Sequence, residues 1–268
     1  MRISEYKKNQ SNFLVPFEQY GDRSSKSMNQ KIKFRHGTLS DCHTATDFVV
    51  VIDVLRAFTT AAYAFQSGAK DIFCVSEVEE AFHLHTQMKN SYLLGEINGY
   101  RIPGFHYNNS PAAISSVDLT GKTIIMRTTA GTQGLIRSIH AETILACSFV
   151  NASATAAYIQ THQPDEVFFV ETGVTADGRG DEDIACAEYV EGIITNQRIP
   201  EETLKERVIN SKNGMRFQNP SSKDLPKEDL DFVCSFDLFH FAMTAERINS
   251  RLIRLHAIDI DDGSQCTI

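Results

Sequence analysis

Short, continuous apolar runs recur along the chain, and a loop of small, hydroxylated or acidic residues follows each of them. The clearest runs are FVVVI (48–52), TIIM (123–126), ILAC (144–147) and VFFV (167–170). Such runs are typical of strands buried on both faces of a sheet. Beyond each loop the apolar positions take helical spacing; in the last helix Ile184, Ala187, Val190 and Ile194 form one stripe. The pattern predicts four strand–loop–helix units.

The remaining pattern completes an α/β chain. Further strands are expected at 31–34, 71–76, 91–96, 231–236 and 251–258, and further helices at 58–70, 76–89 and 200–208. Gly68 is expected to close its helix in a left-handed conformation, and Ser76 with Glu79 to form a capping box. The fold class is therefore a layered α/β/α arrangement with a largely parallel or mixed central sheet and a C-terminal strand pair. Residues 1–30 are polar and are expected to form a flexible extension. Residues 31–268 form the domain, as one body or as two lobes sharing a cleft.

Composition narrows the functional classes. The 268 residues are 42% hydrophobic and 22% charged, with a net charge of −8, so a large core is expected and a nucleic-acid surface is not. The six cysteines show no zinc-binding spacing and are expected to be reduced thiols of a cytoplasmic protein. No secretory signal and no apolar run of membrane-spanning length is found. A homodimer is the default expectation.

Asp53 and Arg56 stand at the end of the first buried run, where an unpaired charge would cost several kcal/mol. In open α/β sheets, ligands bind beyond the carboxyl ends of the strands, so the two residues are expected to face a cleft. The alternative is a structural ion pair between them, and these two residues alone do not decide between the readings.

Two further loops that follow predicted strands contain residues suited to binding an anion or a metal ion. Residues 127–132, RTTAGT, offer a cation, hydroxyls and a glycine for an anion, although ordinary helix capping by Thr is the alternative. The spacing is not that of a nucleotide-binding P-loop. Residues 177–183, DGRGDED, bring three acidic residues to a helix start, where the helix dipole alone favours them. Their density also suits Mg²⁺, with Glu96 as another candidate ligand.

Two phosphatase signatures were weighed against this pattern. Asp53 lacks the second Asp two residues later that haloacid-dehalogenase phosphatases need. Arg35-His36-Gly37 is the short signature of histidine phosphatases, but no second His stands in a recognisable context. A histidine phosphatase using His36 is therefore kept as the weaker alternative.

Taken in order, VVVIDVLRAFTT, LLGE, NNSP, RTTAGT, CSFVNAS and GVTADGRGDEDIACA resemble the 2-phosphosulfolactate phosphatase (ComB) family. The resemblance runs from about residue 45 to FVCSFDLFHFAM and leaves residues 1–30 and 212–230 outside. It implies that 31–268 is a ComB-like phosphatase domain. It also implies a cytoplasmic, magnesium-dependent phosphatase for 2-phosphosulfolactate or a similar phosphorylated 2-hydroxy acid, of a kind that serves coenzyme M biosynthesis. Position 108 is Asn where the family pattern favours Gly, which leaves the substrate preference open.

With the resemblance, the loops give three sets of expected site residues. The catalytic set is Asp53, Arg56, Arg127 and Asp183. The Mg²⁺ ligands are Asp53, Glu96, Glu182 and Asp183. The substrate-binding set is Thr59, Asn109, Ser110, Thr128, Thr129, Gly131, Thr132, Ser148, Asn151, Gly178 and Arg179. Asp53 or Asp183 is the base or the nucleophile, and the three arginines are expected to hold the anionic groups of a small phosphoester. A catalytically inactive paralogue that binds organic anions is the alternative.

Overall fold

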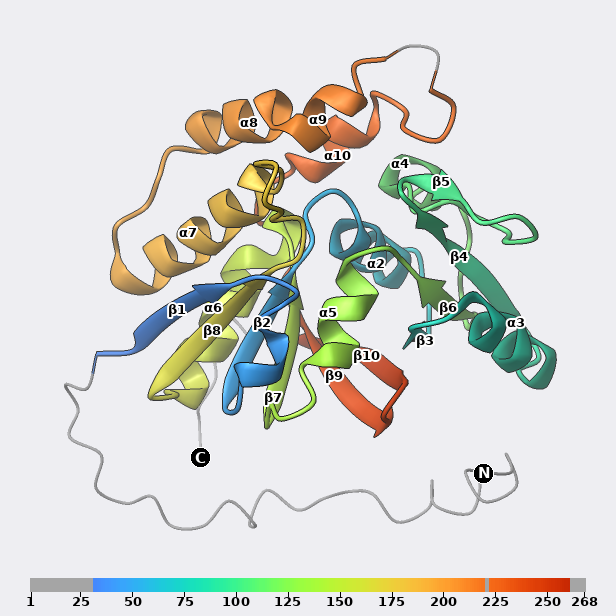
Figure 1. Ribbon diagram of the computed structural model, residues 1–268, viewed down its shortest axis with the longest axis horizontal. Coiled ribbons are helices and arrows are strands. Elements are labelled where there is room, and N and C mark those ends of the chain that lie inside the picture. The colour runs from blue at the N-terminus through green and yellow to red at the C-terminus, as the bar shows by residue number, and fades with distance from the viewer. Residues whose placement is uncertain (1–30, 220–221, 261–268) are drawn as a thin grey trace, which may run out of the picture.

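The computed structural model describes residues 31–219 and 222–260. The prediction of a flexible extension at residues 1–30 lies outside the described residues. Within them, ten strands form one mixed sheet, and helices cover both of its faces (Figure 1). The predicted α/β class and the antiparallel C-terminal strand pair are confirmed.

The sheet consists of two parallel sets of strands joined by an antiparallel ribbon. The first set, in spatial order, is β1 (Lys33–Gly37), β8 (Glu166–Glu171), β2 (Phe48–Ile52) and β7 (Thr143–Cys147). The ribbon is β9 (Phe241–Asn249) and β10 (Leu252–Asp259). The second set is β3 (Asp71–Val75), β6 (Thr123–Arg127) and β4 (Ser91–Ile97), with the short antiparallel β5 (Tyr100–Arg101) at the edge. The ribbon therefore lies inside the sheet rather than at its edge.

Strand β2 shows why the apolar runs are continuous. Its five residues are all buried, and alternate side chains of a strand point to opposite faces. Val49 and Val51 enter the core cluster under α2 (Ala57–Gln66) and α5 (Gly131–Arg137). Val50 and Ile52 enter the cluster under α6 (Ala152–His162) and α7 (Asp181–Thr195). A strand with a helical layer on each face needs apolar residues at every position.

The second parallel set is covered by α3 (Val78–Gln87), whose Ala81 packs in a third cluster with residues of β3, β4 and β6. Gly68 takes φ +95° after α2, so the predicted left-handed ending of that helix is confirmed. The predicted capping box is displaced by one residue. The cap of α3 is Glu77, whose N–H donates to Glu80 Oε2 at 3.3 Å.

The region after α7 differs from the expectation in one respect. Helices α8 (Glu201–Asn210), α9 (Lys212–Arg216) and α10 (Asp229–Val233) lie across the top of the molecule in Figure 1. Residues 231–236 were expected to be a strand, and this was wrong, because the end of α10 occupies residues 231–233 and irregular chain follows it. The first strand of the pair starts later, at Phe241. None of the helices in the described residues has the length and apolar character needed to cross a lipid bilayer.

The remaining short elements belong to the loops around the sheet. They are a 3-10 turn (Cys42–Thr44), α4 (Pro111–Ile114) and a second 3-10 turn (Phe149–Asn151). All four predicted strand–loop–helix units are present, as β2–α2, β6–α5, β7–α6 and β8–α7.

Candidate active site

Asp53 lies at the carboxyl end of β2, where three chain segments meet. Its Oδ1 accepts a hydrogen bond of 3.0 Å from the N–H of Ala57, at the start of α2. The loop after β6 reaches it from the other half of the sheet: a Cβ on Gly131 would lie 2.7 Å from Asp53 Oδ2. Because glycine has no Cβ, it lets the 128–132 loop approach the Asp53 carboxylate this closely.

The start of α7 brings two more buried carboxylates to the same place. Asp183 Oδ1 accepts from the N–H of Val54 at 2.8 Å, and its Oδ2 accepts from the N–H of Gly173 at 2.7 Å. Glu182 Oε1 accepts from Asn213 Nδ2 at 2.6 Å. Its Oε2 is buried without a hydrogen-bond partner among the described residues. A buried carboxylate oxygen in that state costs free energy unless a ligand meets it.

Glu96 orders the loop after β6 instead of standing free. Its Oε1 accepts from the N–H of Thr129 at 2.6 Å, and its Oε2 accepts from Thr129 Oγ1 at 2.9 Å and from the N–H of Gly99 at 2.5 Å. One carboxylate thus joins the turn between β4 and β5 to the start of α5.

Burial and mutual repulsion perturb the acids of this cluster. Burial first, and then the charges of Glu96 and Glu182, raise the pKa of Asp53 from 3.8 to about 7. Burial, followed by the charges of Glu182 and Asp53, raises the pKa of Asp183 well above its ordinary range. Burial likewise raises the pKa of Glu182. Carboxyl groups that share a dry site are hard to ionise together, and a bound cation relieves this.

The fit of this cluster to Mg²⁺ can be examined directly. Across residues 31–219 and 222–260, no three His, Cys, Asp or Glu side chains are close enough together to ligate one metal ion. Mg²⁺ commonly takes only one or two carboxylates and completes its shell with water and substrate oxygens. The unpartnered Glu182 oxygen and the repelling acids around it suit such an ion.

The three arginines expected to hold substrate have different environments. Arg56 is buried and its Nη1 pairs with Asp229 Oδ2 at 2.6 Å; within the described residues no ion pair joins it to Asp53. Arg127 donates to the carbonyls of Ser76 and Glu96 at 3.3 and 3.2 Å. Arg179 is half-exposed and pairs with Asp177. Of the three arginines, Arg127 is the one whose hydrogen-bond partners in the described residues are neutral backbone carbonyls.

The other expected substrate residues bond mainly within their own loops. Thr59 donates to the carbonyl of Val54, and the side chains of Thr128 and Thr132 bond each other's backbone N–H. Asn151 Oδ1 accepts from the N–H of Ser148. Gly178 takes φ +79° in the loop before α7. These contacts fit helix-start turns, which was the alternative interpretation of the hydroxyl residues.

Two buried side chains of the expected substrate set differ from this pattern. Asn109 Oδ1 and Ser148 Oγ are buried and have no hydrogen-bond partner in the described residues. Ser110, next to Asn109, donates to Asp229 Oδ1 at 2.7 Å. Asp229 was missed by sequence reasoning.

His36, the residue of the weaker alternative, is held between two acids. Its Nδ1 contacts Glu171 Oε1 at 2.7 Å and its Nε2 contacts Glu191 Oε2 at 3.5 Å. The hydrogen bond to Glu171 is the main cause that raises the pKa of this imidazole. A raised pKa disfavours the neutral imidazole that a histidine nucleophile needs.

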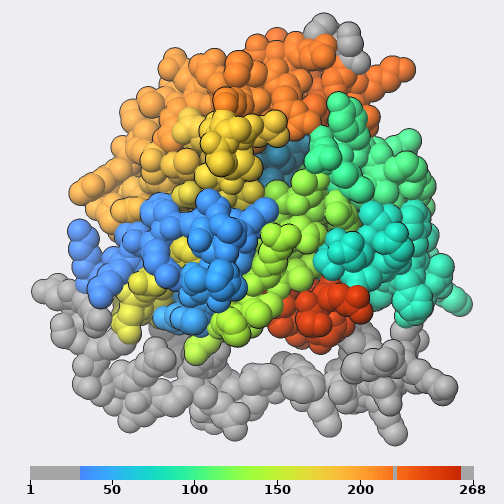
Figure 2. Space-filling model, in the orientation of Figure 1, coloured from blue at the N-terminus to red at the C-terminus, as the bar shows by residue number. Residues whose placement is uncertain are grey.

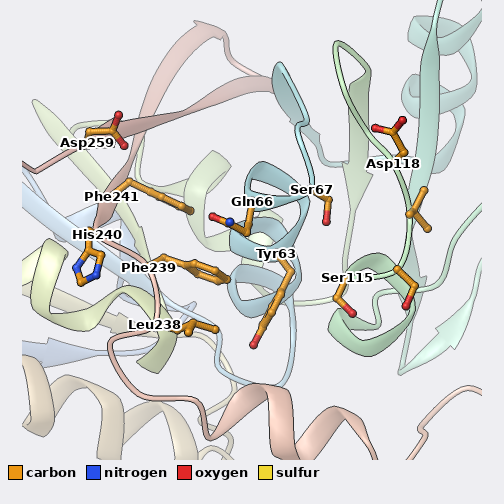
Figure 3. Close-up of a pocket in the computed structure, with 12 residues that line it drawn as sticks. Tyr63, Gln66, Ser67, Ser115, Asp118, Leu238, Phe239, His240, Phe241 and Asp259 are labelled. Carbon is orange, nitrogen blue, oxygen red and sulfur yellow. The ribbon is translucent and has the colours of Figure 1, made fainter.

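A separate cavity of about 790 Å³ lies beside the second half of α2 (Figure 3). Tyr63 and Phe239 line it together with Ser115, Asp118 and Asp259. Its described lining includes no Lys or Arg and none of the four clustered carboxylates. A dianionic phosphoester does not suit that lining.

Figure 2 shows a recess over the start of the α2 region. Its borders are the yellow loop before α7, the orange segment of α8–α10 and the green segment around β5.

Comparison with known proteins decides the family. The model of the 2-phosphosulpholactate phosphatase family matches residues 36–247. The chain belongs to the 2-phosphosulfolactate phosphatase family. The resemblance drawn from the loop sequences is thereby confirmed, and the matched span also includes residues 212–230, which the loop sequences had left outside.

Individual members of the family agree. A protein named "Probable 2-phosphosulfolactate phosphatase" from Bacillus subtilis (strain 168) is 35% identical over 194 residues, covering 72% of this chain and 83% of that protein. One of the same name from Carboxydothermus hydrogenoformans is 41% identical over 150 residues, covering 56% of this chain and 61% of its own length. Another, from Caldanaerobacter subterraneus subsp. tengcongensis, is 39% identical over 134 residues, covering 49% and 56%.

Proposed function

We propose that this chain is a magnesium-dependent phosphatase that hydrolyses 2-phosphosulfolactate, or a similar phosphorylated 2-hydroxy acid, to the hydroxy acid and phosphate. The observation that carries the proposal is the meeting of Asp53, Glu182 and Asp183, three buried carboxyl groups with raised pKa values, at the ends of β2 and β8. Membership of the family supports the substrate class.

Asp53 and Glu182 are the best-placed residues to hold Mg²⁺, with Asp183 as a further candidate. Glu182 has a buried oxygen without a protein partner, whereas both oxygens of Asp183 already accept backbone N–H groups. Bound there, the ion would neutralise negative charge on the phosphoryl oxygens.

The chain's own groups then have distinct tasks. The pKa of Asp53 is about 7 in the metal-free cluster, and a bound cation would keep this carboxylate ionised, so that it can accept a proton from the attacking water near neutral pH. Arg127 supplies the cation for an anionic group of the substrate, since its recorded partners are neutral carbonyls. Asn109 Oδ1 is buried without a hydrogen-bond partner in the described residues, so this oxygen is placed to accept from a donor such as the attacking water or a substrate hydroxyl.

The test is phosphate release from 2-phosphosulfolactate, phospholactate and phosphoglycolate, each with Mg²⁺ and with a chelator. The wild type is expected to release phosphate only with the metal, and Asp53→Asn to lose nearly all of that rate. Asp118→Asn, which changes an exposed acid in the separate cavity, is the matched control and should keep the wild-type rate. Full rate in Asp53→Asn or without metal would refute the proposal. Ligand-induced thermal stabilisation without any phosphate release would favour the anion-binding paralogue.

A further inference from the structure

Asp229 is a fully buried carboxylate at the start of α10 that the site described so far does not use. Both of its oxygens are occupied. Oδ2 accepts from Arg56 Nη1 at 2.6 Å, and Oδ1 accepts from Ser110 Oγ at 2.7 Å and from the N–H of Ala112 at 3.1 Å. Charged hydrogen bonds of this kind are the strong, directional ones. One side chain thus joins α10, the loop after β2 and the start of α4.

The ion pair between Asp229 and Arg56 affects Asp53 through the short turn after β2. Arg56 lies between Asp53 and Ala57, the residue whose N–H binds Asp53 Oδ1. Its guanidinium also donates to the carbonyl of Asp224 at 3.0 Å and lies 5.1 Å from the ring centre of Phe217. Because Phe217, Asp224 and Asp229 fix the guanidinium, the turn that orients the Asp53 carboxylate is fixed as well.

The second contact bears on Asn109. Ser110 caps α4 by accepting from the N–H of Ala113 at 3.3 Å while its hydroxyl donates to Asp229. Its neighbour Asn109 is 2% exposed, and its Oδ1 has no partner among the described residues. A buried amide in that state is costly, so its placement must be enforced by its surroundings.

We propose that Asp229 is a positioning residue of the phosphatase site. Through Arg56 it sets the orientation of Asp53, and through Ser110 it sets the position of Asn109, so that one carboxylate fixes the spacing between a reacting group and a substrate contact. This inference rests on the proposed phosphatase function. It adds a residue from the segment that the loop sequences had left outside the family resemblance.

The chain provides a matched control for a purely structural role. Asp71 on β3 is also a buried acid paired with an arginine, since its Oδ1 accepts from Arg254 Nε at 2.9 Å. Both partners lie within the sheet, Asp71 on β3 and Arg254 on β10. Asp71→Asn therefore breaks an ion pair within the sheet, whereas Asp229→Asn breaks one beside the site, so a difference between the two variants reports on the site.

The experiment measures phosphate release and amide hydrogen exchange on the full-length chain with both variants. Asp229→Asn is expected to lower kcat by up to about 100-fold with KM little changed, because misplacing a reacting group costs rate more than binding. Exchange is expected to quicken in residues 53–58 and 109–114. Asp71→Asn is expected to leave both readouts at wild-type values. Ser110→Ala, which keeps the ion pair, should quicken exchange at 109–114 only.

The outcomes separate two failures. If the wild type releases no phosphate from any ester, the proposed function fails, and the exchange rates alone decide whether Asp229 positions the two loops. If the wild type is active but Asp229→Asn matches Asp71→Asn in kcat, or leaves exchange in both segments unchanged, the positioning role of Asp229 is overturned.

Discussion

Replacing Asp53 by Asn should stabilise the metal-free protein at alkaline pH while removing its activity. Asp53 is buried among carboxylates, and its pKa is raised from 3.8 to about 7. A group whose pKa is higher in the folded state adds stability at low pH and loses that contribution as the pH rises through the folded-state value. Asn has nearly the same shape and no charge, so it removes this pH-dependent cost.

The magnitude follows from the shift. At about 1.4 kcal/mol per pKa unit, the raised pKa of Asp53 lowers the free energy of unfolding by about 4 kcal/mol at pH 8 and by about 2 kcal/mol at pH 5, where the unfolded chain is ionised at this residue and the folded protein is not. Asn keeps an acceptor for the N–H of Ala57 but loses the one that meets the N–H of Gly131. That loss costs about 1–2 kcal/mol. The variant should therefore be about 2–3 kcal/mol more stable than the wild type at pH 8 and nearly equal to it at pH 5.

Urea unfolding at both pH values, with a chelator present, measures this difference. Asp118→Asn is the control: the pKa of this exposed acid is lowered, so its effect should not change between pH 5 and pH 8. Excess Mg²⁺ should cancel the advantage of Asp53→Asn, because the ion stabilises only the wild-type cluster. An Asp53→Asn variant that is equally affected at pH 5 and pH 8, or less stable than the wild type at pH 8, would refute the reasoning.

Two further substitutions test the geometry around this acid. In Gly131→Ala the new methyl group would lie 2.7 Å from Asp53 Oδ2, so we expect a loss of about 1–3 kcal/mol in unfolding free energy together with a fall in kcat. Gly134→Ala is the control, because its new methyl group would lie 2.6 Å from Val51 Cγ1 in the core. It should lose as much stability in urea as Gly131→Ala but keep the wild-type kcat. Equal kcat values for the two variants would contradict the prediction. His36→Ala should keep metal-dependent phosphate release. Its loss in unfolding free energy should be larger at pH 5.5 than at pH 8.5, because the pKa of His36 is raised and its ion pairs weaken as the imidazole loses its proton. Metal-independent release that His36→Ala abolishes would instead favour the histidine phosphatase.

The buried strands and the acids at their ends could be predicted from the sequence because both signals are local. The run FVVVI predicts a buried strand, and Asp53 directly after it indicates where that strand ends. The same logic failed at residues 231–236, since a short apolar run does not distinguish a strand from one side of a buried helix. The helix signal was present there: Pro226 and the acidic residues that follow it are typical of a helix start.

Asp229 could not be found in this way because its importance depends on contacts 173 and 119 residues away, with Arg56 and Ser110. In the sequence it is one acid within a charged stretch and looks like a solvated residue. The place of the ribbon β9–β10 within the sheet was equally hidden. The alternation in residues 251–258 predicts β10, but β9 was not predicted, and the pattern carries no information on which strands the ribbon joins.

The balance of charge gives the strongest reason for the metal in the proposal. Four carboxylates, Asp53, Glu96, Glu182 and Asp183, are buried in the loops that follow the strands, whereas the positive charge of Arg56 is already matched by Asp229. A substrate with phosphoryl, carboxyl and sulfonate groups brings several more negative charges to a dry site. Arg127 alone cannot offset them, and the cost of bringing like charges together rises steeply as water is excluded. Either Asp53, Glu182 and Asp183 take up protons, which their raised pKa values allow, or a divalent cation accompanies the substrate, and only the second arrangement leaves Asp53 ionised to accept a proton at neutral pH.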